Sequence, residues 1–179
     1  MTSWTETELA TANTAKNVPY LDSLEKEIVL YMNLARLYPA RFKIIVSQNH
    51  LGTTEIPELY KNSENRRSLL RDLANMKPLK ALLPDSVLTE TANCFSNELA
   101  ESSKANHRRK NCAEGYSGEN LAFGTYNAKD IVMDLLIDDG VASLGHRKNI
   151  FNPKFTKVGV AYGDHKRYKK CTVIDFMST

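Results

Sequence analysis

The chain has 179 residues, of which 42% are hydrophobic and 25% are charged, and its formal net charge is +3. A single domain of this length buries roughly two-thirds of its unfolded surface, so it needs no disulfide or metal to fold. The weak positive charge does not indicate a nucleic-acid partner. No apolar run approaches the roughly 20 residues of a membrane-spanning helix, so we expect no transmembrane segment.

The first twenty residues predict a tail. Residues 1–20 are rich in Thr, Asn and Ala, lack periodicity and end near Pro19, which indicates a disordered or extended segment. They also lack the charged start and apolar centre of a signal peptide. Two explanations stay open: the protein remains in the cytoplasm, or an export signal precedes Met1 in the full gene. We expect residues 21–179 to form the single domain.

The first part of this domain is predicted to be helical. Asp22 and Glu25 have the spacing of a capping box, and the apolar residues that follow recur at helical intervals until Pro39 ends the helix. Residues 47–63 read as a loop, broken by Gly52 and Pro57. Two more helices are expected, from Glu64 to about Met76 and from Asp85 or Ser86 to about Asn106.

The second part contains one more helix and two strands. Asn127 is expected to cap a helix from Ala128 to about Ile137. Val158–Tyr162 and Cys171–Phe176 alternate in the manner of strands and are joined by a charged turn. Both faces of these strands are substantially apolar, so each face requires cover. Helices first and a small sheet last predict an α+β fold.

The three cysteines limit disulfide formation to one bond. Cys94, Cys112 and Cys171 include no CxxC pair, which excludes a zinc ribbon or a thioredoxin-type motif. Cys112–Cys171 is the favoured pair, because both residues are expected outside helix interiors. Three free, buried thiols are an equally open interpretation.

Three segments together resemble the bacterial form of the CAP superfamily, the cysteine-rich secretory, antigen 5 and pathogenesis-related proteins. They are EKEIVLYMNLARLYPARF, GENLAFG and GHRKNIFNPKFTKVGVAYG. The spacing of GEN and GHR, with a helix between them and a hydrophobic hairpin after, makes the resemblance specific. It implies an α-β-α sandwich around a small central antiparallel sheet. It also implies a secreted or cell-envelope location, and hence a leader or lipoprotein signal upstream of Met1.

The resemblance also implies a cleft lined by two histidines and two acids. Carried over by position, three of them are His107, Glu119 and His146. The family's second acid follows a helical Trp by three residues; aligning that Trp with Leu136 gives Asp139, with Asp138 as the second choice. Asp is one methylene shorter than the family's Glu.

If His107 and His146 converge, two kinds of chemistry are open. Neutral imidazoles bind divalent metals such as zinc, and a carboxylate–imidazole pair can serve in acid/base catalysis. Two histidines fall short of the three protein ligands usual in catalytic zinc sites. We therefore expect no required cofactor and at most weak zinc binding by this pair. Glu119 and His146 each follow a glycine, which we expect to present their side chains from tight turns.

The sequence favours a binding module over an enzyme. HExxH and G-x-S-x-G motifs are absent, and Arg108–Lys110 and Lys166–Lys170 read as solvated basic turns. We expect a secreted monomer whose His/acid cleft binds an extracellular ligand such as a lipid, a peptide or a cell-wall component. The alternative is a metal- or acid/base-dependent hydrolase that uses the same cleft, so enzymatic activity stays open.

Overall fold

The computed structural model describes residues 4–48, 50–51, 54–55, 63–124 and 127–178. The helices are α1 (Glu6–Ala12), α2 (Ser23–Leu37), α3 (Pro39–Ser47), α5 (Glu64–Asn75), α6 (Ser86–Ala100), α7 (Ala128–Ile137) and α8 (Gly145–Ile150). The strands are β1 (His50–Leu51), β2 (Thr54–Glu55), β3 (Leu83–Pro84), β4 (Gly118–Phe123), β5 (Phe155–His165) and β6 (Lys169–Ser178). None of the described helices is both long enough and apolar enough to cross a membrane.

The central sheet has the strand order β3-β5-β6-β4. β5 and β6 form an antiparallel hairpin, and β4 pairs antiparallel with β6. The two-residue strand β3 adds parallel to β5, a pairing that the sequence did not predict. The hairpin is longer than its alternating segments indicated. The predicted α+β class and the antiparallel core of the sheet are confirmed.

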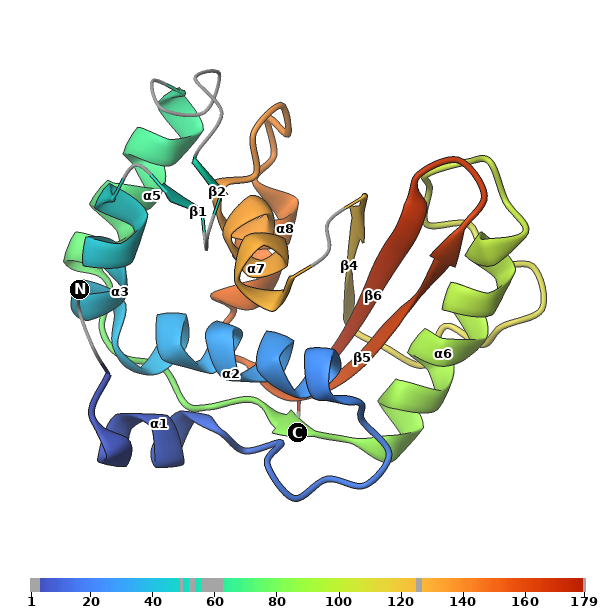
Figure 1. Cartoon of the computed structure of the whole chain (residues 1–179), viewed down its shortest axis with the longest axis horizontal. Coiled ribbons are helices and arrows are strands. Elements are labelled where there is room, and N and C mark those ends of the chain that lie inside the picture. Colours follow the sequence, from blue (N-terminus) through green and yellow to red (C-terminus); the bar gives the residue numbers. More distant parts are fainter. Residues whose placement is uncertain (1–3, 49, 52–53, 56–62, 125–126, 179) are drawn as a thin grey trace.

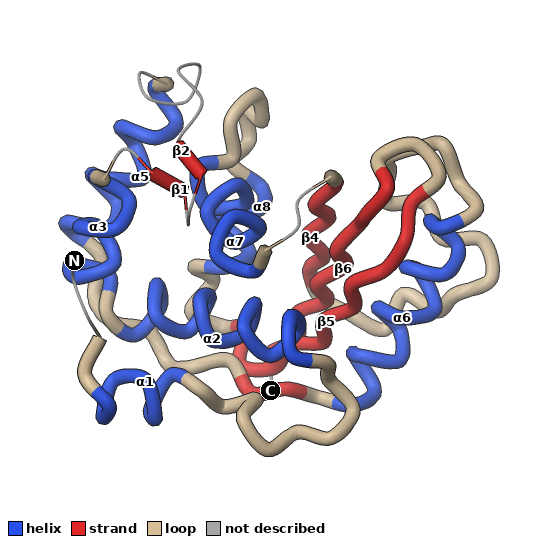
Figure 2. Tube along the Cα trace, viewed as in Figure 1, coloured by secondary structure: helices blue, strands red, loops and turns tan. Residues whose placement is uncertain are grey.

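Helices cover both faces of the sheet. In Figure 1, α6 lies on one side of the strands, and α2, α7 and α8 lie on the other. The coloured tube in Figure 2 shows the same three layers. On the α6 side, Ala161, Cys171 and Val173 pack against Phe95 and its helical neighbours. The opposite face belongs to the larger core, with Val158, Val160, Ile174 and Phe176 among its members. The two-sided cover expected from the alternating strands is confirmed.

Helix α6 lies unusually close to β5. A Cβ atom placed on Gly159 would lie 2.2 Å from the carbonyl carbon of Leu88 and 2.4 Å from the amide nitrogen of Thr89. Gly163, on the same face of the strand, faces Ser96, whose Oγ would lie 2.4 Å from an added Cβ. No side chain fits between the helix and strand at position 159, so the glycine sets how near the two elements approach.

The predicted N-terminal tail is wrong for the described residues 4–20. Thr5 and Glu8 form a capping box that begins α1, and Ala12 and Ala15 are fully buried. The buried amide of Asn33 donates to the carbonyl of Ala12 at 3.0 Å. The segment is therefore packed onto α2. Its Thr- and Ala-rich composition concealed a short helix with a local start signal.

Several helix boundaries differ from the prediction. Pro39 ends α2 as expected but also occupies the first turn of α3, where a proline costs no hydrogen bond. Helix α6 ends at Ala100, so His107 lies in the following loop and not at the helix end. Within the loop predicted over residues 47–63, β1 and β2 pair in antiparallel fashion, and residues 49, 52–53 and 56–62 lie outside the described part of the chain.

The disulfide joins Cys94 to Cys112, and Cys171 is free and buried. The favoured Cys112–Cys171 pair is therefore wrong. Cys94 lies on the exposed side of α6, and the loop after the helix runs back along that side. The Glu98 carboxylate holds this loop by accepting the amides of Lys110 and Asn111, at 2.9 and 2.6 Å. Cys171 faces the inner side of the same helix, near Ser96.

Arg36 of α2 is fully buried and joins two distant segments. Its guanidinium donates to the carbonyls of Lys80, Ile150, Asn152 and Phe155, at distances of 2.6 to 3.1 Å. Burial lowers its pKa to about 10, so it stays charged at neutral pH. No carboxylate pairs with it among the described residues. Asn33, one turn earlier, bonds the chain at Leu82. Both polar residues therefore hold distant backbone segments together.

Candidate functional site

The first histidine–acid pair consists of His107 and Glu119. The His107 ring nitrogen Nδ1 lies 2.7 Å from Oε1 of Glu119. The Glu119 side chain is only 2% exposed, whereas that of His107 is 54% exposed. Because an ionised carboxylate can only accept, Nδ1 donates. The other ring nitrogen, Nε2, has no hydrogen-bond partner among the described residues and is free to meet a ligand.

Arg109 holds the carboxylate of this pair in place. Its side chain is 1% exposed, and its guanidinium donates to Glu119 Oε2 and to both carboxylate oxygens of Asp175. The guanidinium lies between the rings of Phe95 and Tyr116, 4.6 and 4.5 Å from their centroids. The sequence prediction treated Arg109 as part of a solvated basic turn, which is wrong for this residue.

Asp175 extends the network under α6. It lies opposite Glu119 in the β4–β6 pairing, and its Oδ2 accepts the Thr91 hydroxyl at 2.8 Å. Burial raises the pKa of Asp175 to about 6, against the opposing effects of Arg109 and Thr91. Strand alternation predicts that Asp175 lies on the same face of the sheet as Cys171 and Val173. It does not predict the contacts of Asp175, because the contacting residues belong to other elements.

The second pair consists of His146 and Asp138. His146 Nδ1 lies 2.7 Å from Asp138 Oδ1, and Oδ2 accepts the backbone amides of His146 and Arg147, at 2.9 and 3.3 Å. Asp138 is in the left-handed conformation that ends α7, with a φ of 57°. This turn directs its carboxylate to the first turn of α8, where amide donors favour a negative charge. Here too, Nε2 of the imidazole has no partner within the described chain.

Strand β4 connects the two pairs. Glu119 points to the α6 side of the sheet, and the next residue, Asn120, points to the α8 side. The Asn120 amide donates to the carbonyl of His146 at 3.0 Å. Asn149 donates to the Glu119 carbonyl and to Asn120 Oδ1, at 3.2 and 2.8 Å. Both asparagines bond backbone carbonyls, and they fix the histidine pairs relative to one another.

The glycines before the site residues have a role other than the one expected. Gly118 begins β4, where an added Cβ would lie 2.9 Å from the Phe155 ring, and Gly145 begins α8. Neither belongs to the described glycines with positive φ, which are Gly124 and Gly140. Gly118 therefore allows close packing and does not form a tight turn.

Of the four expected cleft residues, the structure pairs His107 with Glu119 and gives the acid beside His146 as Asp138. Asp139, the first choice, makes no described contact with His146; it lies one residue past the turn that directs Asp138. Among the described residues, no three His, Cys, Asp or Glu side chains are arranged to hold one metal ion. Each pair also has its carboxylate occupied by donors. These residues therefore do not fit a strong zinc site.

The sandwich and its histidine–acid pairs define the class of protein. Residues 59–176, well over half of the chain, match the Cysteine-rich secretory protein family, CAP, and the chain belongs to that family. It is 27% identical over 123 residues to the "Uncharacterized protein YkwD" of Bacillus subtilis (strain 168). The match covers 62% of this chain and 46% of that protein, so the chain spans less than half of this relative's length.

Proposed function

We propose that the chain is an extracellular binding module whose ligand contacts the two histidine–carboxylate pairs. One observation is the main support for this function. Each imidazole is fixed through Nδ1 by a buried carboxylate, while its Nε2 has no partner among the described residues. A neutral ring offers an acceptor at Nε2 and a protonated ring offers a donor. The pairs thus present two oriented polar contacts to a lipid, peptide or cell-wall ligand.

The occupied carboxylates favour binding over hydrolysis. Glu119 is bonded by Arg109, and Asp138 by the first amides of α8, so neither has an open oxygen with which to activate water. The Thr91 hydroxyl, which joins the network of the first pair through Asp175, is bonded to both Leu88 and Asp175. The alternative, an acid/base hydrolase, is supported by the carboxylate-oriented imidazoles, which have the arrangement of a general base with its orienting group.

Two features support an extracellular location. The matched family is described as secretory, and the structure contains the Cys94–Cys112 disulfide. Disulfides persist in oxidising compartments and are rare in the cytosol. An export signal upstream of Met1 is part of this proposal. Sequencing the upstream region of the gene checks it.

The test compares the wild-type chain with the double variant His107→Ala/His146→Ala. Co-sedimentation with purified peptidoglycan and with phospholipid vesicles, together with a peptide array, covers the three ligand classes. Binding that the double variant loses while its thermal midpoint is retained supports the proposal. Equal binding by both proteins places the ligand elsewhere. Chromatography of the bound ligand after incubation addresses the alternative, since fragments formed by the wild type alone indicate a hydrolase.

A further inference from the structure

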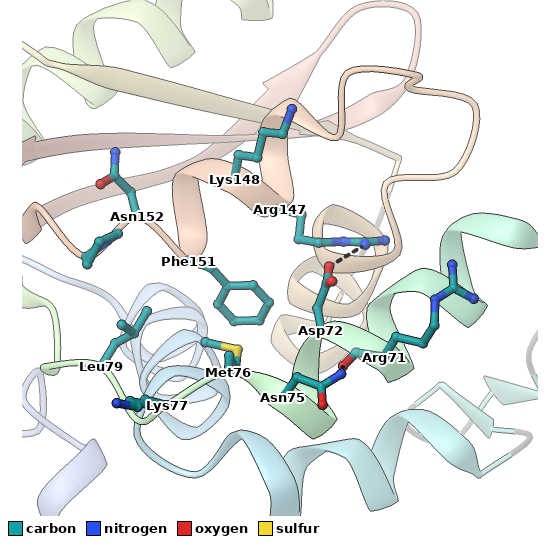
Figure 3. A pocket seen from close by; sticks show the side chains of 11 residues that line it. Arg71, Asp72, Asn75, Met76, Lys77, Leu79, Arg147, Lys148, Phe151 and Asn152 are labelled. Carbon is teal, nitrogen blue, oxygen red and sulfur yellow. Dashed lines mark hydrogen bonds and ion pairs between the residues drawn. The ribbon is translucent and has the colours of Figure 1, made fainter.

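A cavity of about 700 Å³ lies between the end of α5, the connector after it and the end of α8. Figure 3 shows the Phe151 ring at its centre, with Met76 and Leu79 beside it. None of His107, Glu119, Asp138 and His146 lines this cavity. It is therefore separate from the two histidine–acid pairs. Its volume falls in the range of small-molecule sites, roughly 300–1,000 Å³.

The inner surface of the cavity is apolar. Met76 and Phe151 are partly buried and pack against the main core, and Leu79 and Pro153 complete the apolar lining. Partly exposed side chains of this kind gain from contact with an apolar ligand, at roughly 25 cal/mol for each Å² removed from water.

The charges around this surface are unbalanced. Arg147 and Asp72 neutralise each other across a 3.0 Å ion pair, and Arg71 is held by Glu64 at 2.7 Å. Lys77 and Lys148 are exposed, and neither has an acidic partner among the described residues. Figure 3 shows them on opposite sides of Phe151. Two free cations thus flank the apolar surface.

A third positive charge lies behind the wall. Arg36 donates to the carbonyl of Asn152 and accepts the amide of Leu79 through its own carbonyl, at 3.1 and 2.8 Å. Both Leu79 and Asn152 line the cavity. Arg36 therefore holds two walls in register, and its guanidinium, bonded to carbonyl oxygens alone among the described groups, adds positive potential in a region of low dielectric.

We propose that this cavity binds a small amphiphilic anion, with its apolar body on Phe151, Met76 and Leu79 and its carboxylate or phosphate at Lys77 or Lys148. An apolar surface flanked by unpaired cations attracts neither a neutral hydrocarbon nor a small inorganic anion as well as a molecule that combines both properties. The anionic group of this ligand belongs to a free carboxylic acid or to a phosphate ester, because both combine an apolar body with a negative charge.

Isothermal titration and ¹⁵N–¹H NMR of the full chain test this site with four probes below their micelle concentrations. Decanoate and decyl phosphate represent the two sources, and decan-1-ol and inorganic phosphate each lack one half of the ligand. We expect one or both anionic amphiphiles to bind, with amide shifts at residues 76–79 and 147–153, and the other two probes to bind at least about tenfold more weakly. Added salt weakens the binding through screening.

Two double variants with the same change in net charge distinguish the contribution of Lys77 and Lys148 to binding from a general effect of charge. Lys77→Gln/Lys148→Gln should weaken binding at least about tenfold, whereas Lys104→Gln/Lys166→Gln, with the same charge change at exposed positions in the loop after α6 and in the β5–β6 turn, should not. All four lysines lie on the surface, so both double variants should have the melting temperature of the wild type. Equal affinity for decan-1-ol, equal loss in both variants, shifts centred on His107 and His146, or no binding of either anion would overturn the proposal.

Discussion

Arg109 reaches Asp175 through a single nitrogen, Nη2, which lies 2.8 and 2.9 Å from the two carboxylate oxygens. The same nitrogen contacts Glu119, so one buried cation serves two buried carboxylates from neighbouring strands. Breaking a buried ion pair by removing one partner costs more than forming it contributes, because the remaining charge stays desolvated. The first histidine pair therefore depends on a residue that touches neither the imidazole nor solvent.

Replacing this cation should destabilise the fold strongly. We expect Arg109→Met to lower the free energy of unfolding by about 3–5 kcal/mol, since it leaves two buried carboxylates uncompensated. Its exposed neighbour provides the control: Arg108→Met should change stability by no more than about 0.5 kcal/mol. Urea denaturation of the three proteins measures both values. A loss below about 1 kcal/mol for Arg109→Met would show that the carboxylates do not need the guanidinium.

The raised pKa of Asp175 gives stability a definite pH dependence. The folded-state pKa of about 6 lies above the ordinary value of 3.8, so the native state binds this proton more tightly than the unfolded chain does. The stability that this adds is fully present below about pH 4 and is lost as the pH rises through about 6. Asp175→Asn does not titrate, so this variant does not lose this stability in that pH range.

The melting temperature of Asp175→Asn relative to wild type should accordingly increase between pH 4 and pH 7.5, by about 5–10 °C. Thermal melts followed by circular dichroism at a series of pH values provide the measurement. Thr91→Val, which removes the hydroxyl that bonds Asp175 but keeps the carboxyl group, serves as a second variant in the same series of melts. A difference that stays constant with pH, or that falls, would contradict the direction.

The choice between Asp138 and Asp139 can be tested at the His146 ring. Asp138→Asn keeps a side chain suited to the left-handed turn but removes the charge that orients the imidazole. We expect it to move the ¹⁵N resonances of the His146 ring clearly. Asp139→Asn, one residue further, should leave them within the spread of unrelated surface variants. The reverse pattern would restore Asp139 as the fourth site residue.

Zinc should bind weakly to the wild-type chain. Each pair offers one imidazole and a carboxylate already occupied by other donors, so calorimetry should give a dissociation constant weaker than about 10 µM, far short of structural zinc sites. His107→Ala/His146→Ala should abolish this binding and leave the melting temperature nearly unchanged. Undiminished binding in the double variant would place the metal elsewhere, and loss of folding would make the histidines structural.

Thiol counting checks the disulfide. Under native conditions no thiol should react with a chromogenic disulfide reagent, because Cys171 is buried. Denaturation should expose one thiol, and denaturation with reduction should expose three. Cys94→Ser/Cys112→Ser should cost about 3 kcal/mol, as closing a loop of this length constrains the unfolded chain. Three reactive thiols in the denatured, unreduced protein would mean that the bond does not form.

Local patterns were enough to predict much of the fold. The Asp22–Glu25 capping box, the Asn127 cap and the alternating hairpin each depend on residues near in sequence, and each is present in the structure. The N-terminal capping box at Thr5 and Glu8 was equally local and was overlooked. It could have been found by the same rule that located Asp22.

The remaining features depend on long-range contacts. Arg108 and Arg109 are adjacent and chemically identical, but only Arg109 turns inward between two rings. Cys94 finds Cys112 because the loop folds back over α6, which no spacing rule indicates. Asp138, and not Asp139, contacts His146, because the chain has a positive φ at Asp138 where α7 ends.

Position 159 shows how the first histidine pair depends on a missing atom. With hydrogen as its side chain, Gly159 lets the start of α6 lie directly on the β5 backbone. One turn along this helix, Thr91 then reaches Asp175 with its hydroxyl and Arg109 with its carbonyl, both at 2.8 Å. Any larger side chain would wedge the helix off the strand and lengthen both contacts together. Mutational scans of the polar site alone would therefore overlook one of the residues that determine its dimensions.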